Sequence, residues 1–124
     1  MESIYQKYIS TTTTIDESDP TKLDIVCRLL ENGDRFFSFK QAVWFAGGSS
    51  MGWGDSLDKS RNLSINILNR FLPGEDVQLY VGSVSRSAHL LSEAFLRDII
   101  SPMPEEGARL PAGEIIKWID QNSV

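Results

Sequence analysis

The chain has 124 residues, 41% of them hydrophobic and 23% charged, which is the length and composition of one ordinary folded domain. Its 17 acidic and 12 basic residues give a formal charge of −5, and the basic residues are scattered, which disfavours a nucleic-acid partner. The single cysteine excludes an internal disulfide and favours a reducing compartment.

Residues 1–19 combine β-branched and aromatic residues with a run of threonines and a polar stretch that ends before a proline. This composition predicts an N-terminal strand followed by a polar connection. The opening letters, MESIYQKYIS, lack the apolar centre of a signal peptide. No apolar run approaches the roughly twenty residues of a membrane span, so we expect a cytoplasmic protein.

Residues 20–33 fit two structures. As a helix, the segment begins at an Asp-Pro pair, which suits an N-cap and a first-turn proline, and it ends at an Asn-Gly pair. As a hairpin, the apolar residues alternate from Leu23 to Leu29, and the Asn-Gly pair makes the turn. The start signal favours the helix, with Cys27 as a small residue on its apolar face.

The central part of the chain alternates between strand and helix patterns. Residues 35–39 and 42–46 are predicted to be buried strands, residues 58–72 an amphipathic helix, and residues 77–81 a short strand.

The last part of the chain predicts two further helices. Ser87 suits the N-cap of a helix that stops at a Ser-Pro pair, and Leu110 with Pro111 opens a final helix that carries Trp118. Together the elements predict one small α+β domain over residues 1–124. We expect a short β-sheet of N-terminal and central strands, packed by three to four helices.

A glycine-rich loop, AGGSSMGWGDSL, occupies residues 46–57. Glycines ahead of a helix let backbone N–H groups bind an anion, but the loop lacks the Gly-Lys-Ser/Thr ending of a nucleotide-binding P-loop. Residues 54–57 spell the tetrapeptide of the GDSL hydrolases. The only histidine, His89, lacks the aspartate that the GDSL family places three residues earlier, since position 86 is an arginine. The match is interpreted as coincidence, and no catalytic residue is predicted.

No metal site or cofactor is predicted either. One cysteine and one histidine cannot form a zinc centre, and the carboxylates lack the spacing of a calcium loop. His89 lies early in a predicted helix, where a solvated or capping role is more common than a catalytic one.

The order of motifs from the loop onward carries a family resemblance. Residues 51–57 lead into a helix, a second helix ends with the letters AFLRDII, and a last helix reads EIIKWI. Over residues 49–120 the chain resembles a family of small bacterial, plasmid and phage proteins known as a domain of unknown function. Asp55 stands where those proteins favour tyrosine. The resemblance implies a shared architecture and a mobile-element setting, and it implies no chemistry.

Trp53 is the residue of the loop that most invites a role. Gly52 and Gly54 allow the strand to turn sharply into the following helix. Trp53 between them either packs on the core, which is the more common fate of a tryptophan, or projects as an anchor for a partner. In the second case Met51 and Asp55 would share the binding surface.

Two functions follow from these patterns. The first is a non-enzymatic protein that binds a partner protein as an inhibitor or modulator, for example of a host defence complex, through Trp53 and its neighbours. The alternative is a small anion- or nucleotide-binding module centred on residues 47–61. Its predicted ligands to the anion are Gly52, Gly54, Ser56, Lys59 and Arg61.

Overall fold

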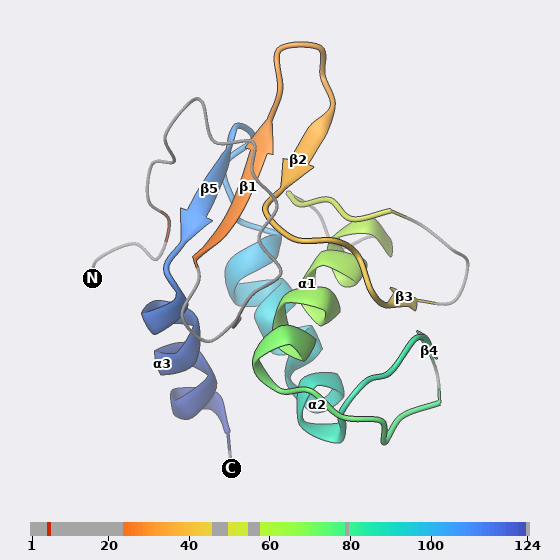
Figure 1. Cartoon of the computed structure of the whole chain (residues 1–124). Helices are drawn as coiled ribbons and strands as arrows, with labels where there is room; N and C mark the ends of the chain where they lie inside the picture. Colours follow the sequence, from red (N-terminus) through yellow and green to blue (C-terminus); the bar gives the residue numbers. More distant parts are fainter. Residues whose placement is uncertain (1–4, 6–23, 46–49, 55–57, 79, 124) are drawn as a thin grey trace. The chain divides into compact units, whose positions relative to one another are not determined.

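The computed structural model describes residues 5, 24–45, 50–54, 58–78 and 80–123 (Figure 1). The chain divides into two compact units. We call the described part of the first the sheet region (residues 24–40 and 103–123). The described part of the second, between residues 41 and 102, is the helical region. Apart from Tyr5, the predicted N-terminal strand and polar connection lie outside the described residues.

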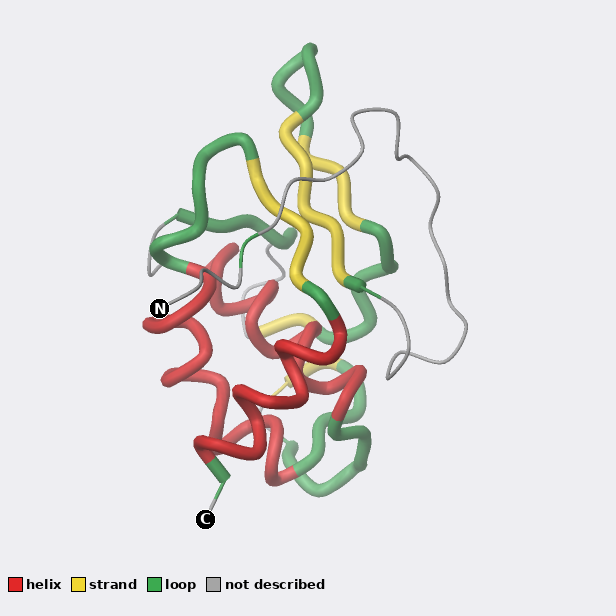
Figure 2. The backbone as a smooth tube through the Cα atoms, turned by 90° about the vertical axis from the view of Figure 1, so that its left-hand side faces the viewer, coloured by secondary structure: helices red, strands yellow, loops and turns green. Residues whose placement is uncertain are grey.

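The sheet region is built on a three-stranded antiparallel sheet. Strand β1 (Ile25–Leu29) lies in the middle, with β2 (Arg35–Phe37) on one side and β5 (Gly107–Leu110) on the other. Figure 2 shows these three strands side by side in yellow. At the centre of the register, Cys27 pairs with both outer strands and is fully buried.

The helix predicted over residues 20–33 is wrong, because the described part of this segment forms the hairpin of β1 and β2. Gly33 has φ +90°, and its N–H donates to the carbonyl of Leu30 at 3.0 Å, which closes the turn. The Asn32 side chain accepts from the N–H of Asp34 at 3.0 Å and holds the same turn. The alternating apolar pattern and the Asn-Gly turn therefore prevail over the Asp-Pro start signal.

Strand β5 was not foreseen, and a glycine explains how it fits. Gly107 has φ +91°, and a Cβ atom there would lie 2.0 Å from the carbonyl oxygen of Cys27. Only glycine allows the backbone of β5 to approach β1 so closely.

The predicted final helix is confirmed as α3 (Ala112–Asn122), which follows β5 after Pro111. The carboxylate of Asp24 links strand β5 to the first residue of α3. One oxygen accepts from the N–H of Ala112 and the other from the Arg109 guanidinium, each at 3.0 Å. Negative charge at a helix N-terminus is favourable, so Asp24 stabilises the start of α3.

In the helical region, the predicted helix at residues 58–72 is confirmed as α1 (Asp58–Phe71). Its burial differs from an amphipathic pattern, because every residue from Asn62 to Leu68 is buried, the polar ones included. A buried polar side chain needs hydrogen-bond partners, and those of α1 find them in the loops around the helix.

The second predicted helix is confirmed as α2 (Arg86–Phe95), which continues as a single π-helical turn, η2 (Leu96–Ile100). Its N-cap is Ser85 and not the predicted Ser87. Ser85 has an extended backbone, and its Oγ accepts from the N–H of Ala88 at 3.0 Å, the third residue beyond the cap.

The two predicted strands flanking α1 are short and pair with each other. Strand β3 (Trp44–Phe45) runs antiparallel to β4 (Tyr80–Val81), so Phe45 lies opposite Tyr80 and Trp44 opposite Val81. With three helices and short antiparallel sheets among the described residues, the predicted α+β class is confirmed.

Candidate functional site

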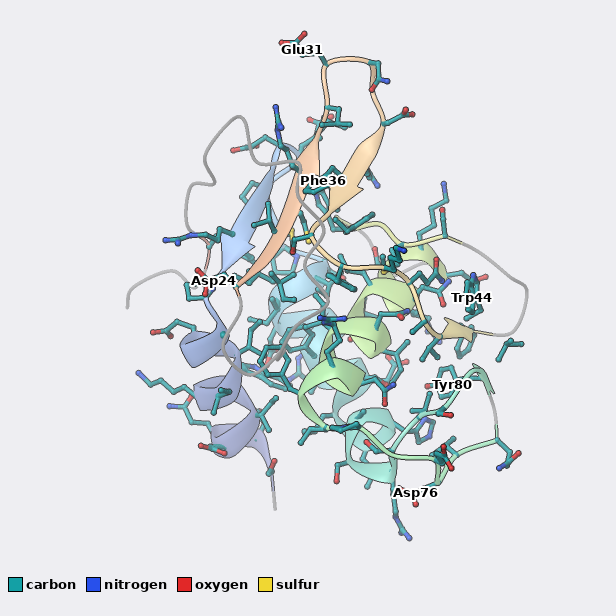
Figure 3. The ribbon with its side chains drawn as sticks, viewed as in Figure 1. Asp24, Glu31, Phe36, Trp44, Asp76 and Tyr80 are labelled. Atoms are coloured by element: carbon teal, nitrogen blue, oxygen red, sulfur yellow. The ribbon has the colours of Figure 1, made fainter. Side chains whose placement is uncertain are left out.

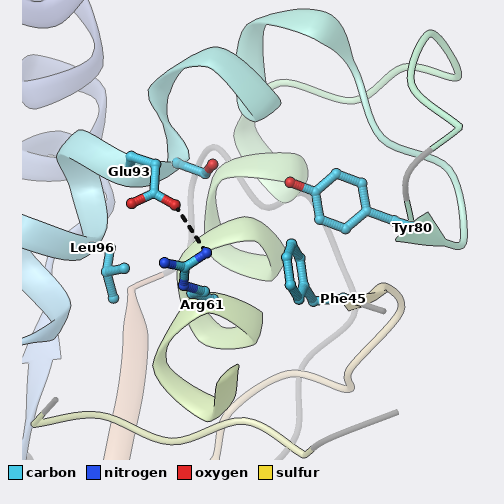
Figure 4. Close-up of a pocket in the computed structure, with 6 residues that line it drawn as sticks. Phe45, Arg61, Tyr80, Glu93 and Leu96 are labelled. Atoms are coloured by element: carbon cyan, nitrogen blue, oxygen red, sulfur yellow. Dashed lines mark ion pairs between the residues drawn. The ribbon is translucent and has the colours of Figure 1, made fainter. Parts of the chain in front are cut away.

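A hollow in the helical region gathers polar and aromatic side chains from four elements and one leucine from η2 (Figure 4). We call it the Arg61 hollow. Its volume is about 230 Å³, including space open to solvent. The residues that line it are Phe45, Arg61, Tyr80, Ser92, Glu93 and Leu96.

Side-chain amides of α1 hold the wall that carries Phe45. Asn66 Oδ1 accepts from the N–H groups of Ala42 and Val43 at 2.8 and 2.9 Å, while its Nδ2 donates to the carbonyl of Val43 at 2.7 Å. One turn earlier, Asn62 Oδ1 accepts from the N–H of Phe45 at 2.6 Å. The two asparagines thus bind β3 and the residues before it as a neighbouring strand would.

A third asparagine of α1 holds the opposite wall. Asn69 Nδ2 donates to the carbonyl of Ser83 at 2.7 Å, and its Oδ1 accepts from the N–H of Ser85 at 3.3 Å. We call Asn62, Asn66 and Asn69 the asparagine row, since residues four and three apart share one face of a helix. The row fixes both segments that frame the hollow.

Gly82 brings those two segments together. It has φ +110°, and a Cβ atom there would lie 2.5 Å from the carbonyl oxygen of Ala42. The absence of a side chain lets the end of β4 close onto the residues that lead into β3.

Arg61 is the cation of the hollow. Its guanidinium carbon lies 5.7 Å from the centroid of the Phe45 ring, within the range of a cation–π contact. Its Nη1 lies 3.4 Å from Oε1 of Glu93. Figure 4 shows the guanidinium between this carboxylate and the Phe45 ring.

Tyr80 forms the far wall. Its ring packs edge-on against Phe45, with 5.7 Å between centroids, and its hydroxyl shares a 3.0 Å hydrogen bond with Nδ1 of His89. Burial raises the pKa of the Tyr80 phenol above 10.0, opposed in part by a hydrogen bond with Ser92. The phenol is therefore neutral at physiological pH and can donate or accept.

These groups do not form a serine nucleophile. The Ser92 hydroxyl donates to the main-chain carbonyl of His89 at 2.8 Å, while ring atom Nδ1 of the same histidine faces Tyr80. A nucleophilic serine needs its proton to point at a base. The arrangement is suited to binding a polar group and not to activating Ser92.

Two of the three residues predicted to bind a partner are buried. Trp53 is 3% exposed and Met51 is 7% exposed, while Asp55 lies outside the described residues. The buried alternative for Trp53 is the one that the structure shows. A tryptophan in this position supports the core and presents no anchor to a partner.

Among the described residues predicted to bind an anion, the two glycines use their amides within the fold. The N–H of Gly52 donates to the carbonyl of Lys59 at 3.0 Å, and that of Gly54 donates to the carbonyl of Ile100 at 3.1 Å. These two amides already serve the fold. Lys59 is exposed, Ser56 lies outside the described residues, and Arg61 faces Glu93 in the hollow.

Sequence reasoning singled out Arg61 but not the other residues that line the hollow. A partial signal exists on α2 and η2, where His89, Ser92, Glu93 and Leu96 recur at intervals of three and four and so share one helix face. Phe45 and Tyr80 carry no such signal, because only the pairing of β3 with β4 brings them together.

Comparison with protein-family models, with curated proteins and with solved structures finds no match to this chain. The resemblance over residues 49–120 therefore stays a prediction. Within the described residues, no helix has the length and apolar character to cross a membrane, and no group of histidine, cysteine or acidic residues has the arrangement of a metal site.

Proposed function

We propose that this chain acts by binding another protein, and that the partner docks on the surface around the Arg61 hollow. One observation carries the proposal. The described residues include three exposed large apolar side chains, and two of them, Val81 at 68% and Leu90 at 66% exposed, lie on elements that also contribute to the hollow. Val81 follows Tyr80 in β4, and Leu90 lies one turn before Glu93 on α2.

Trp44 extends this apolar surface. It is half-buried and lies opposite Val81 in the ladder, so the two side chains share the face that points away from Phe45 and Tyr80. Figure 3 labels Trp44 and Tyr80 on the two neighbouring strands. Exposed aromatic and aliphatic groups are typical of protein interfaces, where a few such side chains supply most of the binding energy.

The size of the hollow favours a protein over a cofactor. Pockets for drug-sized ligands and cofactors enclose about 300–1,000 Å³. The 230 Å³ of the Arg61 hollow includes space open to solvent, and its enclosed part has room only for a water-sized group, too little for a cofactor. The anion-binding alternative is less well supported, because Gly52 and Gly54 use their amides within the fold.

The nature of the partner rests on the resemblance alone. The resemblance suggests a phage or plasmid setting, in which this chain would inhibit or modulate a host protein, such as a component of a defence complex; its expected cytoplasmic location comes from composition. This part of the proposal stays a prediction.

Site-specific photo-crosslinking in the native host tests the docking surface. A photoreactive phenylalanine analogue replaces Val81, Leu90 or, as a control in the sheet region, Ile116, which is 36% exposed. We expect the same partner to be crosslinked from the first two positions and not from Ile116. A second variant, Val81→Asp with Leu90→Asp, should abolish capture while leaving the fold intact. Crosslinking from Ile116 alone, or from none of the three, contradicts the proposal.

A further inference from the structure

We propose that the Arg61 hollow receives a carboxylate group of the partner, which displaces Glu93 from the guanidinium of Arg61. This inference rests on the proposed function and names the chemistry of the partner. The carboxylate belongs either to an acidic side chain or to a chain terminus.

The guanidinium of Arg61 is well placed to bind an anion. Arg61 extends from α1, a helix buried on all sides over Asn62–Leu68, and its guanidinium is held beside Phe45. Its side chain is 40% exposed. A guanidinium fixed on a rigid helix and open on one side loses little freedom when it binds, and its planar fork matches a carboxylate.

The ion pair between Arg61 and Glu93 is weak. The distance of 3.4 Å from Nη1 to Oε1 exceeds the 2.7–2.9 Å of a strong charge-assisted bond. The Glu93 side chain is 70% exposed. Exposed pairs of this kind contribute little to stability, so an incoming carboxylate with two shorter bonds can replace Glu93 at little cost.

Tyr80 provides a second donor. The Tyr80 hydroxyl lines the same hollow, and its proton is available to a carboxylate in the tautomer of His89 whose Nδ1–H donates to the phenol oxygen. A guanidinium and a phenol O–H can both donate to a carboxylate, and the bonds of the guanidinium are charge-assisted. Glu93 then serves as an internal substitute that covers Arg61 until the partner arrives.

The distribution of charge permits an acidic ligand here. Residues 41–102 contain six acidic and five basic residues, a net of −1. The remainder of the chain contains eleven acidic and seven basic residues, a net of −4. Long-range repulsion of an acidic group is therefore weaker at the helical region than elsewhere on this acidic protein.

Three short peptides test the inference by NMR titration of the full chain: N-acetyl-Ala-Glu-Ala-amide, the same peptide with Gln in place of Glu, and N-acetyl-Ala-Ala-Ala with a free carboxyl end. We expect the Nε–H signal of Arg61 to shift with one or both carboxylate peptides, at millimolar affinity, and not with the Gln peptide. The two carboxylate peptides tell an acidic side chain from a chain terminus.

Two variants give effects of opposite sign. Glu93→Gln should tighten binding of the carboxylate peptide about 3- to 5-fold, because the internal competitor is lost. Arg61→Gln should abolish binding. Matched controls, Glu114→Gln on α3 and Arg86→Gln at the exposed start of α2, should leave the affinity within about 2-fold.

Equal shifts with the Gln peptide, no shift with either carboxylate peptide, or weaker binding in Glu93→Gln each overturn the inference. These outcomes differ from failure of the proposed function. If crosslinking from Val81 and Leu90 succeeds while the peptides fail, the partner docks through the apolar surface without a carboxylate in the hollow.

Discussion

The two regions supply hydrogen-bond partners to their short strands in different ways. In the sheet region, the backbone of β1 pairs with the backbones of β2 and β5. In the helical region, β3 pairs with β4 on one side, while Asn62 and Asn66 bind the N–H and carbonyl groups on its other side. A strand neighbour made of backbone is replaced there by the side chains of a helix.

This difference predicts opposite sensitivities to substitution. A backbone ladder is indifferent to most side chains, so the sheet region is most vulnerable where a side chain is added at a glycine. A ladder built from side-chain amides fails when one of them is removed, since buried backbone groups then lose their partners. The predictions below test this contrast in order of decreasing effect.

Gly107→Ala should have the largest effect, a loss of about 4 kcal/mol in the free energy of unfolding. The added Cβ atom would lie 2.0 Å from the carbonyl oxygen of Cys27, and the positive φ adds backbone strain. Urea unfolding measures the loss. Reaction of the Cys27 thiol, which is buried in the native protein with its pKa raised by burial, should be faster in the variant.

Gly33→Ala is the matched control for Gly107→Ala. The two glycines have almost the same φ, +90° and +91°, but no atom lies within 4 Å of a Cβ atom placed at Gly33. The strain alone should cost about 1 kcal/mol. Equal losses in the two variants would show that the close approach of β5 to β1 contributes nothing.

Asn66→Ala should rank second, with a loss of about 3 kcal/mol. The change leaves the N–H groups of Ala42 and Val43 and the carbonyl of Val43 without their amide partner, and an unsatisfied buried group costs about 1–3 kcal/mol. Urea unfolding again gives the value.

Asn69→Ala is the control for Asn66→Ala on the same helix. Asn69 makes two bonds, to Ser83 and Ser85, from a half-buried position where water can replace it. We expect a loss of about 1 kcal/mol. If Asn66→Ala were no worse than Asn69→Ala, the idea that the asparagine row substitutes for a strand would be wrong.

The same contrast explains what the sequence could predict. Local signals are strong where a turn or cap lies within a few residues, so the helices α1, α2 and α3 were predicted at close to their observed positions. The Asn-Gly turn was also visible, and it was misjudged only because an Asp-Pro pair offered a competing helix start. Strand β5 was missed because its pairing depends on Gly107 meeting a residue 80 positions earlier in the chain.

The Arg61 hollow was beyond the reach of sequence patterns for a similar reason. Its residues are brought together by the pairing of β3 with β4 and by asparagines on α1. An asparagine on a helix is normally expected at a solvent-exposed position. Asn62 and Asn66 are buried instead, because the loops around α1 supply hydrogen-bond partners for their side-chain amides. The glycine-rich loop is the more conspicuous sequence pattern, but its Trp53 and Met51 belong to the core.

Tyr80→Phe should have the smallest effect and tests whether the hollow itself carries stability. Loss of the bonds to His89 and Ser92 should cost about 0.5–1 kcal/mol at neutral pH, because water can reach the half-buried site.

The pKa of Tyr80 is raised in the folded state, so the contribution of this phenol to the free energy of unfolding is fully present below its ordinary pKa of 10.0. The contribution is lost as the pH rises through the folded pKa. Stability measured against pH should therefore fall less steeply above pH 10.0 in the variant than in the parent chain. The pKa of Tyr5 is raised as well, to about 12, so Tyr5→Phe serves as the comparison. If stability falls with pH as steeply in Tyr80→Phe as in the parent chain, and less steeply in Tyr5→Phe, the alkaline loss of stability belongs to Tyr5 and not to Tyr80.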